Sequence, residues 1–119
     1  MKNMFGLLPD KMKFKYHARG INKVVVDINS VLKPHLTVID GFIAMDGKGP
    51  VDGWPLKMDL IIAGKDAVAT DATCARVMGL DPNEISHIRC ANKKGIGDID
   101  NIEIVGSKIE DVKRVFKRN

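Results

Sequence analysis

The sequence predicts a small α/β fold, in which three to four helices pack against a small, mainly buried sheet of about three to four strands. Apolar residues recur at three- and four-residue spacing in some segments, which is typical of helices, and gather in short runs of branched side chains in others, which is typical of buried strands. Glycine, proline and aspartate mark the ends of these segments. With 119 residues, the chain has room for one core, so residues 1–119 are expected to form a single domain.

Two helices are defined by apolar spacing and by the residues at their ends. The first covers residues 20–33, and Pro34 ends it. The second begins after Asp66, which stands in the N-cap position, and continues to about Met78, where Gly79 closes it. Both helices have one apolar side that can face a sheet.

Two further helices are expected in the second half of the chain. Asp81 and Pro82 form a cap followed by a proline at the first helical position, and the helix that they start should reach about Asn92. Residues 108–117 form the closing helix, whose basic end suits the negative pole of a helix dipole. Its basic residues are Lys113, Arg114, Lys117 and Arg118.

Three short apolar runs are expected to be strands. Residues 35–44 and 57–64 are rich in branched side chains, as in largely buried strands, and residues 102–105 form a shorter third run. The first two runs are separated by residues 45–55, which contain three glycines and two prolines. This density of glycine and proline predicts a loop without regular structure.

Residues 11–16 have a pattern that allows two interpretations. Lysines alternate there with Met12, Phe14 and Tyr16, which is the period of a strand with one wet and one buried face. An extended loop would show the same alternation.

Composition and cysteine usage exclude several classes of protein. Hydrophobic residues make up 45% of the chain and charged residues 29%, which is typical of folded globular domains. There is no apolar run long enough to span a membrane and no signal peptide pattern, so a cytoplasmic location without membrane contact is expected. Cys74 and Cys90 are expected to be free thiols, and neither they nor the three histidines have the spacing of a zinc or iron–sulfur site.

The positive charge is concentrated near the N-terminus. The net charge is +4, and residues 1–35 carry seven Lys or Arg against two acids. The excess centres on Lys11, Lys13, Lys15, Arg19 and Lys23. Such a surface attracts an anionic ligand, a nucleic acid or an acidic protein, although a solvated basic face that only aids solubility would look the same. No recognition motif accompanies the charge, so nucleic acid is the less expected partner.

Asp71 is the first candidate for a functional carboxylate. In the helix after Asp66, its neighbours one turn away are all apolar. A carboxylate in such a stripe is costly unless it is hydrogen-bonded, paired with a cation or bound to a metal. Asp71 is therefore expected to have a partner, either as a ligand or acid–base group with a perturbed pKa or as a structural group that holds a nearby loop.

Asp40 and the loop that follows it are the next candidates. Asp40 comes after the apolar residues of a predicted strand, and polar groups at the carboxyl ends of strands tend to lie near the ligand crevice of α/β proteins. An Asx turn is the alternative role for Asp40. The loop Asp46-Gly47-Lys48-Gly49-Pro50 offers unobstructed backbone N–H groups and a lysine for a phosphate or carboxylate, but it is not a P-loop.

Several of these segments together resemble a known family. In chain order they are Lys2-Asn3-Met4-Phe5-Gly6, Asp40-Gly41, Met45-Asp46-Gly47-Lys48-Gly49-Pro50, Asp66-Ala67-Val68-Ala69-Thr70-Asp71-Ala72, Met78-Gly79-Leu80-Asp81, Gly95-Ile96-Gly97 and Val105-Gly106. Their order over nearly the whole chain resembles the domain of unknown function numbered 362. The resemblance implies a prokaryotic protein in an iron–sulfur or redox setting, because family members are often fused to ferredoxin-like modules.

The resemblance also implies which residues matter and how the chain relates to the family domain. The residues carried over from the family pattern are Lys2, Asn3, Asp40, Asp46, Gly47, Gly49, Pro50, Asp66 and Asp71. The chain lacks a cluster-binding cysteine set and begins where the family domain would already be under way. The resemblance therefore implies a C-terminal portion of a longer domain, with any iron–sulfur cluster held by a missing or partner segment.

Two functional hypotheses follow. The first is a domain of an iron–sulfur-associated redox protein or enzyme that binds a polar substrate or a divalent cation such as magnesium, calcium or manganese. Its expected cation ligands are Asp40, Asp46, Asp66 and Asp71, of which Asp71 and Asp40 are the candidates for catalysis. Its expected ligand-binding residues are Lys2, Asn3, Gly47, Lys48 and Gly49.

The second hypothesis is a non-catalytic binding or assembly module. It would use the basic N-terminal surface to dock on a protein or nucleic-acid partner. Separately, the family resemblance implies a ferredoxin-like domain or protein as a partner, and an oligomer of the chain itself stays open. A plainer alternative is that the aspartates and glycines only build caps and turns.

Overall fold

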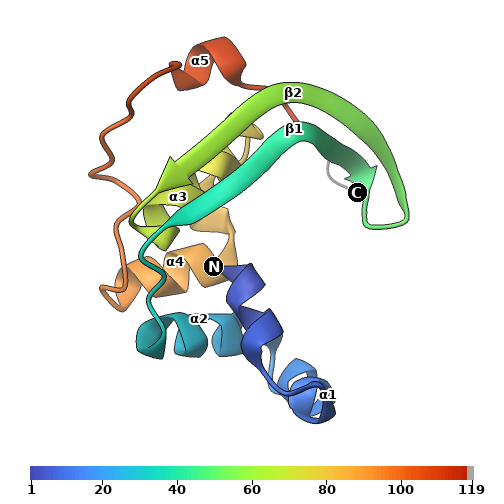
Figure 1. The fold of residues 1–119 in the computed structure, drawn as a ribbon, viewed down its shortest axis with the longest axis vertical. Coiled ribbons are helices and arrows are strands. Elements are labelled where there is room, and N and C mark those ends of the chain that lie inside the picture. The colour runs from blue at the N-terminus through green and yellow to red at the C-terminus, as the bar shows by residue number, and fades with distance from the viewer. Residues whose placement is uncertain (118–119) are drawn as a thin grey trace.

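A long β hairpin arches over a group of short helices in the computed structural model of this chain, which describes residues 1–117 (Figure 1). The two strands are β1 (Thr37–Lys48) and β2 (Asp52–Gly64). The helices, in chain order, are η1 (Lys2–Leu7), α1 (Asp10–Ala18), α2 (Ile21–Val31), α3 (Ala67–Val77), η2 (Pro82–Glu84), α4 (Ser86–Lys93) and α5 (Ile109–Val112). Helix α3 packs against both strands, and α4 contacts both α3 and α2. None of the helices within residues 1–117 combines the length and the apolar character that a membrane span requires.

The α/β class is confirmed, but the predicted number of strands is wrong for the part of the chain that the structure describes. The sheet there has two antiparallel strands, whose register runs from Thr37 opposite Gly64 to Lys48 opposite Asp52. The runs 35–44 and 57–64 fall largely within β1 and β2, as predicted. The expected strand at 102–105 makes no ladder with either of them. A cavity of about 440 Å³ is lined by residues 101–107 on one side and by the end of β2 on the other.

The prediction that residues 45–55 are irregular is wrong, because most of this segment forms the outer half of the hairpin. Met45 lies opposite Pro55 in the ladder. In a sheet of two strands every strand is an edge strand, so a proline is tolerated there. Gly47 has a φ of +80°, and its missing side chain makes room for the ring of Trp54, which lies 3.1 Å from where a Cβ would be. The glycines and prolines therefore shape the strands rather than interrupt them.

Residues 11–16 lie in α1, so both the strand and the extended-loop interpretation are wrong. Lysine and methionine are good helix formers, and six alternating residues are too few to outweigh that propensity. No residue of α1 is buried, so the alternation of lysines with apolar residues does not correspond to a buried face.

The expected closing helix is shorter than predicted. Helix α5 ends at Val112, and the backbone N–H groups of Arg114 and Phe116 donate to the carbonyls of Val77 and Met78, at 2.9 and 3.0 Å. Hydrogen bonds to the end of α3 thus replace the helical ones. Of the basic residues expected at the end of this helix, Arg118 lies outside the described residues.

The other helices follow the sequence closely. Helix α2 ends at Val31, before Pro34, and Gly79 has a φ of +75° just after α3. The helix expected after Asp81 is divided into η2 and α4, because Ile85 between them has an extended backbone.

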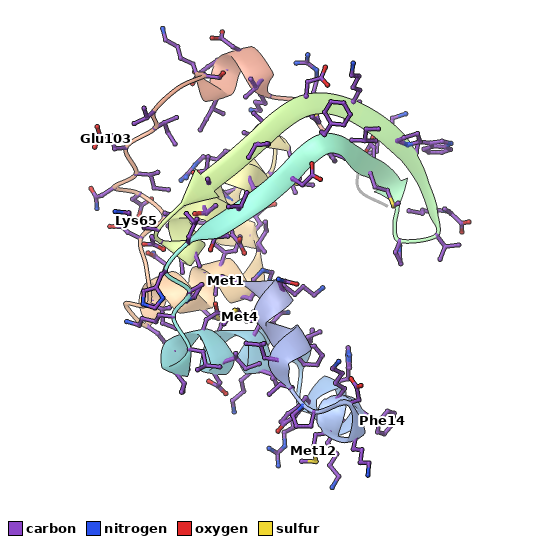
Figure 2. The ribbon with its side chains drawn as sticks, in the orientation of Figure 1. Met1, Met4, Met12, Phe14, Lys65 and Glu103 are labelled. Atoms are coloured by element: carbon purple, nitrogen blue, oxygen red, sulfur yellow. The ribbon has the colours of Figure 1, made fainter. Side chains whose placement is uncertain are left out.

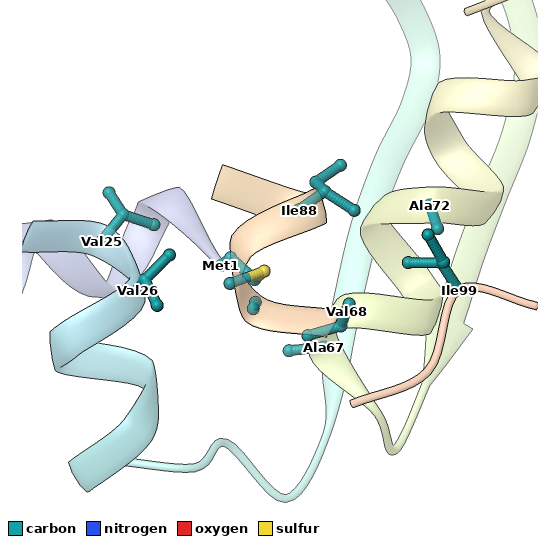
Figure 3. Close-up of a cluster of buried hydrophobic side chains, with 9 residues drawn as sticks. Met1, Val25, Val26, Ala67, Val68, Ala72, Ile88 and Ile99 are labelled. Carbon is teal, nitrogen blue, oxygen red and sulfur yellow. The ribbon is translucent and has the colours of Figure 1, made fainter. Parts of the chain in front are cut away.

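The core lies among the helices and not under the hairpin (Figure 3). Its buried members are Met1, Val25, Val26, Ala67, Val68, Ala72, Ile88, Ala91 and Ile99. These residues come from the N-terminus, α2, α3, α4 and the loop after α4. No residue of β1 or β2 is buried, so the helices hold the chain together and the hairpin projects from them.

Candidate functional site

Asp71 lies in the second turn of α3, and its carboxylate is paired. Its Oδ2 accepts a hydrogen bond from the α-amino group of Met1 at 3.0 Å, and the Asp71 side chain is 17% exposed. The Met1 side chain belongs to the core. Removing this carboxylate would leave an ammonium group without its counter-charge in a largely desolvated place. The structure thus provides the partner that the apolar surroundings of Asp71 require, and that partner is 70 residues away in the sequence.

His87 of α4 belongs to the same neighbourhood, although no sequence pattern points to it. Its Nδ1 lies 3.2 Å from Oδ1 of Asn22 in α2. Burial lowers the pKa of His87, the negative charge of Asp71 opposes that effect, and the positive charges of Lys2 and the Met1 amino group add to it. The imidazole is therefore held in its neutral form, next to an ion pair.

Cys74 lies one turn after Asp71 on α3. Burial and the nearby Asp71 carboxylate both raise the pKa of its thiol. A raised pKa keeps the sulfur protonated at neutral pH, so Cys74 is a poor nucleophile and a poor metal ligand. Its Sγ lies 4.0 Å from the Sδ of Met78, and both Cys74 and Cys90 are free, as predicted. The group around Asp71 thus has the character of a buried polar contact more than that of a reactive centre.

Asp66 is a structural carboxylate that ties two segments together. Its Oδ1 accepts hydrogen bonds from the backbone N–H groups of Val68 and Ala69, at 2.7 and 3.0 Å, and so caps α3. Its Oδ2 accepts a third from the N–H group of Asp98 at 3.0 Å. A Cβ on Gly97 would lie 2.2 Å from Oδ1, so only glycine fits beside this carboxylate. Asp66 therefore holds the loop at Gly97 and Asp98 against the start of α3.

Asp40 and Asp46 both bind backbone groups on or near the hairpin. Oδ1 of Asp40 accepts from the N–H group of Phe42 at 2.9 Å, which is the local Asx-type bond that the sequence left open. Oδ1 of Asp46 accepts from its neighbour Gly47 at 2.8 Å and from Lys117 at 2.6 Å. The second bond joins the hairpin to the C-terminal segment.

The residues expected to bind a ligand are spread over two elements. Lys2 and Asn3 are exposed at the start of η1, whereas Gly47 and Lys48 end β1 and Gly49 begins the turn of the hairpin. Within residues 1–117, none of the three best-formed pockets is lined by residues from either of these two places.

The structure does not bring the four expected cation ligands together. Asp40 and Asp46 lie on the hairpin, Asp66 caps α3, and Asp71 is paired with the N-terminus. In the described part of the chain, there is no group of three His, Cys, Asp or Glu side chains that could hold a metal ion. These residues therefore do not fit a divalent cation, and its binding stays a prediction without support from this arrangement.

The basic surface has the clearest features of a binding region. We use this name for Lys11, Lys13, Lys15, Arg19 and Lys23, which lie on α1, in the short link after it and at the start of α2. Lys13 is paired with Asp10 at 2.5 Å. Within residues 1–117, the other four have no carboxylate within ion-pair distance.

Apolar side chains accompany this charge. Phe14, which is 84% exposed, points away from the body of the molecule, and Met12 is exposed on the same helix (Figure 2). Beside them, a groove of about 650 Å³ is lined mostly by leucine, isoleucine and valine side chains of η1 and α2. Tyr16, Arg19, Lys23 and Asp27 also line it. This end of the molecule therefore combines uncovered apolar surface with four cations, Lys11, Lys15, Arg19 and Lys23, that form no ion pair within residues 1–117.

Comparisons with known proteins confirm the family that the sequence resembles, with a family-model match that ends before the predicted motifs at residues 78–106. The model of the family described as a domain of unknown function, DUF362, matches residues 1–76. The thylakoid-associated protein sll1697 of Synechocystis sp. is 30% identical over 102 residues, which are 81% of this chain and 32% of the relative. The chain thus spans about a third of the length of that relative. No solved structure matches the chain.

Proposed function

Because this chain belongs to the DUF362 family, whose description assigns no activity, we propose its function from its geometry: it is a non-catalytic binding module that docks an acidic protein partner on its basic surface. The observation that carries this proposal is α1 itself. The helix has nine residues, none of them buried, and it presents unpaired lysines together with the exposed ring of Phe14.

The energetics of α1 favour a role in binding. An isolated helix shorter than roughly 12 residues is marginal in water, so a helix of this length normally depends on packing. Within residues 1–117 the packing that α1 receives is slight, since it buries no side chain. A partner that covers Phe14 would supply the missing contact and would stabilise the helix in the same step.

The charge and the groove indicate the chemistry of the partner. Unpaired cations steer an acidic surface towards the site and raise the rate of association. The neighbouring groove has Arg19 and Lys23 in its lining, and its acidic lining residue, Asp27, is already paired with Lys94 at 3.1 Å. The groove therefore suits an amphipathic segment that has an apolar face and acidic flanks. We therefore propose an acidic amphipathic helix of a partner protein as the docked element.

The family resemblance adds candidates for that partner. It implies a ferredoxin-like domain or protein, and we keep that implication as part of the proposal. The Synechocystis relative is named for its association with thylakoids, which is consistent with a module that works attached to a larger assembly. The iron–sulfur setting, the cytoplasmic location and the C-terminal position within a longer domain stay predictions.

A binding experiment with defined probes tests the proposal. Poly-glutamate and a DNA duplex are titrated into the full chain, and fluorescence anisotropy gives the dissociation constant at several salt concentrations. We expect poly-glutamate to bind with a steep salt dependence, and the double change Lys11→Glu and Lys15→Glu to weaken that binding on the order of tenfold or more.

The matched control is Lys48→Glu, a charge reversal at an exposed lysine on the hairpin. Equal losses in the control and in the double variant would contradict the proposal, as would binding that ignores salt. Tighter binding of DNA than of poly-glutamate would replace the protein partner by a nucleic acid.

A further inference from the structure

The cavity of about 440 Å³ beside α3 is a second candidate site. It is lined by the end of β2, by one side of α3 and by residues of the C-terminal segment between 101 and 112. Its volume is within the range of sites that hold small molecules, which is roughly 300 to 1,000 Å³. The basic surface contributes nothing to this lining, and α1 lies at the other end of the molecule (Figure 1).

Branched apolar side chains form much of the cavity wall. Leu60 and Ile62 of β2 are half-buried there, and so are Ile102 and Val112 of the C-terminal segment. Val77 of α3, which is buried, also belongs to the wall. Such a wall suits an aliphatic group, which gains dispersion contacts on several sides at once.

The hydroxyl of Thr73 adds a polar group to this apolar wall. Thr73 lies in α3, lines the cavity and is only 9% exposed. Its hydroxyl makes no hydrogen bond within residues 1–117, whereas the hydroxyl of Thr70 donates to the carbonyl of Asp66 at 2.6 Å. A buried hydroxyl without a partner is costly, which indicates a polar group that reaches Thr73 from the cavity. The hydroxyl can donate to a carboxylate or accept from an ammonium group.

Two opposite charges without ion-pair partners also line the cavity. Lys65 directly precedes Asp66, the cap of α3, and Glu103 lies in the segment after α4, on the same flank of the molecule (Figure 2). In the described part of the chain, neither of them forms an ion pair, with the other or with a third residue. Asp66 lines the cavity as well, but its carboxylate already accepts three backbone hydrogen bonds. The lining thus offers one cation and one carboxylate to a ligand.

We infer that this cavity binds a small zwitterion with an aliphatic side chain, which is the chemistry of an aliphatic amino acid, free or in a short peptide. The ligand carboxylate pairs with Lys65, the ammonium group pairs with Glu103, and the aliphatic side chain packs against the branched wall. Thr73 supplies a third polar contact. A ligand with one charge would leave either Lys65 or Glu103 without a counter-charge, so charge complementarity favours the zwitterion.

Isothermal titration calorimetry of the full chain with L-leucine and with L-leucyl-L-leucine tests the inference. We expect binding of at least one of them, and the tighter one shows whether the source is the free amino acid or a peptide. Three matched ligands each lack one feature of leucine: isocaproate lacks the ammonium group, isoamylamine lacks the carboxylate, and glycine lacks the aliphatic side chain. Each should bind on the order of tenfold more weakly than L-leucine. Absence of binding by both leucine probes at about 10 mM would overturn the inference.

Two charge-removing variants locate the site. Lys65→Gln and Glu103→Gln change exposed side chains, so the fold should be kept, and each should weaken the binding of the tighter leucine probe on the order of tenfold. The matched controls Lys108→Gln and Glu110→Gln change exposed residues that are close in sequence to the cavity lining but are not part of it. Equal losses in the controls would contradict the assignment.

Thr73→Val keeps the shape of the side chain and removes only the hydroxyl. Because that hydroxyl has no partner within residues 1–117, the variant should resist urea at least as well as the wild type while binding the leucine probe on the order of fivefold more weakly. A loss of stability with unchanged binding would make the hydroxyl a structural group and would contradict its part in the site.

The binding of poly-glutamate should be the same in all of these variants, because none of the changed residues belongs to the basic surface. The proposed function and this inference can therefore fail separately. A variant that loses poly-glutamate binding together with leucine binding would contradict the separation of the two sites.

Discussion

The helical core and the β hairpin differ in how their apolar residues are used. The core buries nine side chains within the described chain, whereas the hairpin, with 25 residues in its two strands, buries none. The isoleucines and valines, which are similar in number in the two regions, are therefore buried in the core and at least partly exposed in the hairpin. An apolar pattern in a sequence indicates that a surface will be covered, but it does not tell whether the same chain covers it.

The largest expected effect is the difference in stability loss when apolar atoms are deleted from the core and from the hairpin. Ile99 is 1% exposed, so Ile99→Ala should lower the free energy of unfolding by about 2 to 5 kcal/mol. Ile43→Ala in the hairpin should change it by less than about 0.5 kcal/mol in dilute, monomeric chain. Urea denaturation followed by circular dichroism measures both, and equal losses would remove the contrast between the regions.

A second effect sharpens the comparison at the join between the regions, where Asp66 follows β2 and caps α3. Asp66→Ala removes the acceptor of three backbone hydrogen bonds and should cost about 2 kcal/mol. Asp81→Ala, which removes the acceptor of one such bond at an exposed cap, is the matched control and should cost about 1 kcal/mol or less. The same urea experiment measures both, and equal losses would mean that the bond to the loop at Asp98 adds nothing.

A third prediction tests whether the outer half of the hairpin can be destabilised without unfolding the helices. Gly47→Ala places a side chain at a φ of +80° and against the ring of Trp54, so it should cost about 1 kcal/mol in the outer half of the hairpin. Trp54 is the only tryptophan, and its fluorescence reports on that half. We expect the emission of Trp54 to change while the circular dichroism of the helices stays the same. A loss of helical signal in parallel would show that the two regions unfold as one unit.

The smallest effect concerns the pH dependence of the core side. Burial lowers the pKa of His87 below its ordinary value of 6.5, so near that pH the unfolded chain binds more protons at this residue than the folded chain does. Stability should therefore fall as the pH decreases from about 6.5 through the lowered pKa, and it should recover as the pH rises. His87→Gln should remove this part of the pH dependence, as measured by thermal unfolding in matched buffers. An unchanged pH profile in the variant would contradict the assignment.

The sequence predicted what local chemistry determines. The cap at Asp66 and the helix end at Gly79 follow from which side chains stand next to which backbone groups, and the need of Asp71 for a partner follows from its apolar neighbours on the helix. Such features need only a few neighbouring residues to be recognised. They account for the helices α2 and α3 and for the central parts of both strands.

The features that the sequence did not predict depend on contacts between distant segments. The Met1 amino group reaches Asp71 over 70 residues, and Asn22 reaches His87 over 65, so no local pattern contains either contact. In residues 45–55, the ring of Trp54 lies beside Gly47, a contact across the hairpin. Residues 102–105 have the composition of a strand but no neighbouring edge to pair with. Apolar content alone cannot reveal whether such an edge is present.

Contacts between distant segments also explain which parts of the candidate site could be predicted from the sequence. Each of the four aspartates is a reasonable cation ligand by residue type, and in the structure each accepts a hydrogen bond from an amino or backbone N–H group. Their role as cation ligands stays a prediction. The basic surface was visible in the sequence because charge is additive and needs no folding to be counted. Its apolar groove was not visible, since η1 and α2 must fold together to form it.

The bond between Asp46 and the N–H group of Lys117 has a practical consequence for shortened versions of the protein. It fastens the far part of the arch to the last described residues, next to Phe116, which is buried. Truncating the chain before Lys117 would remove this hydrogen bond, which restricts movement of the outer half of the hairpin. A protein engineer who wants a smaller crystallisable piece should therefore remove nothing ahead of position 118, and affinity tags are better attached beyond it.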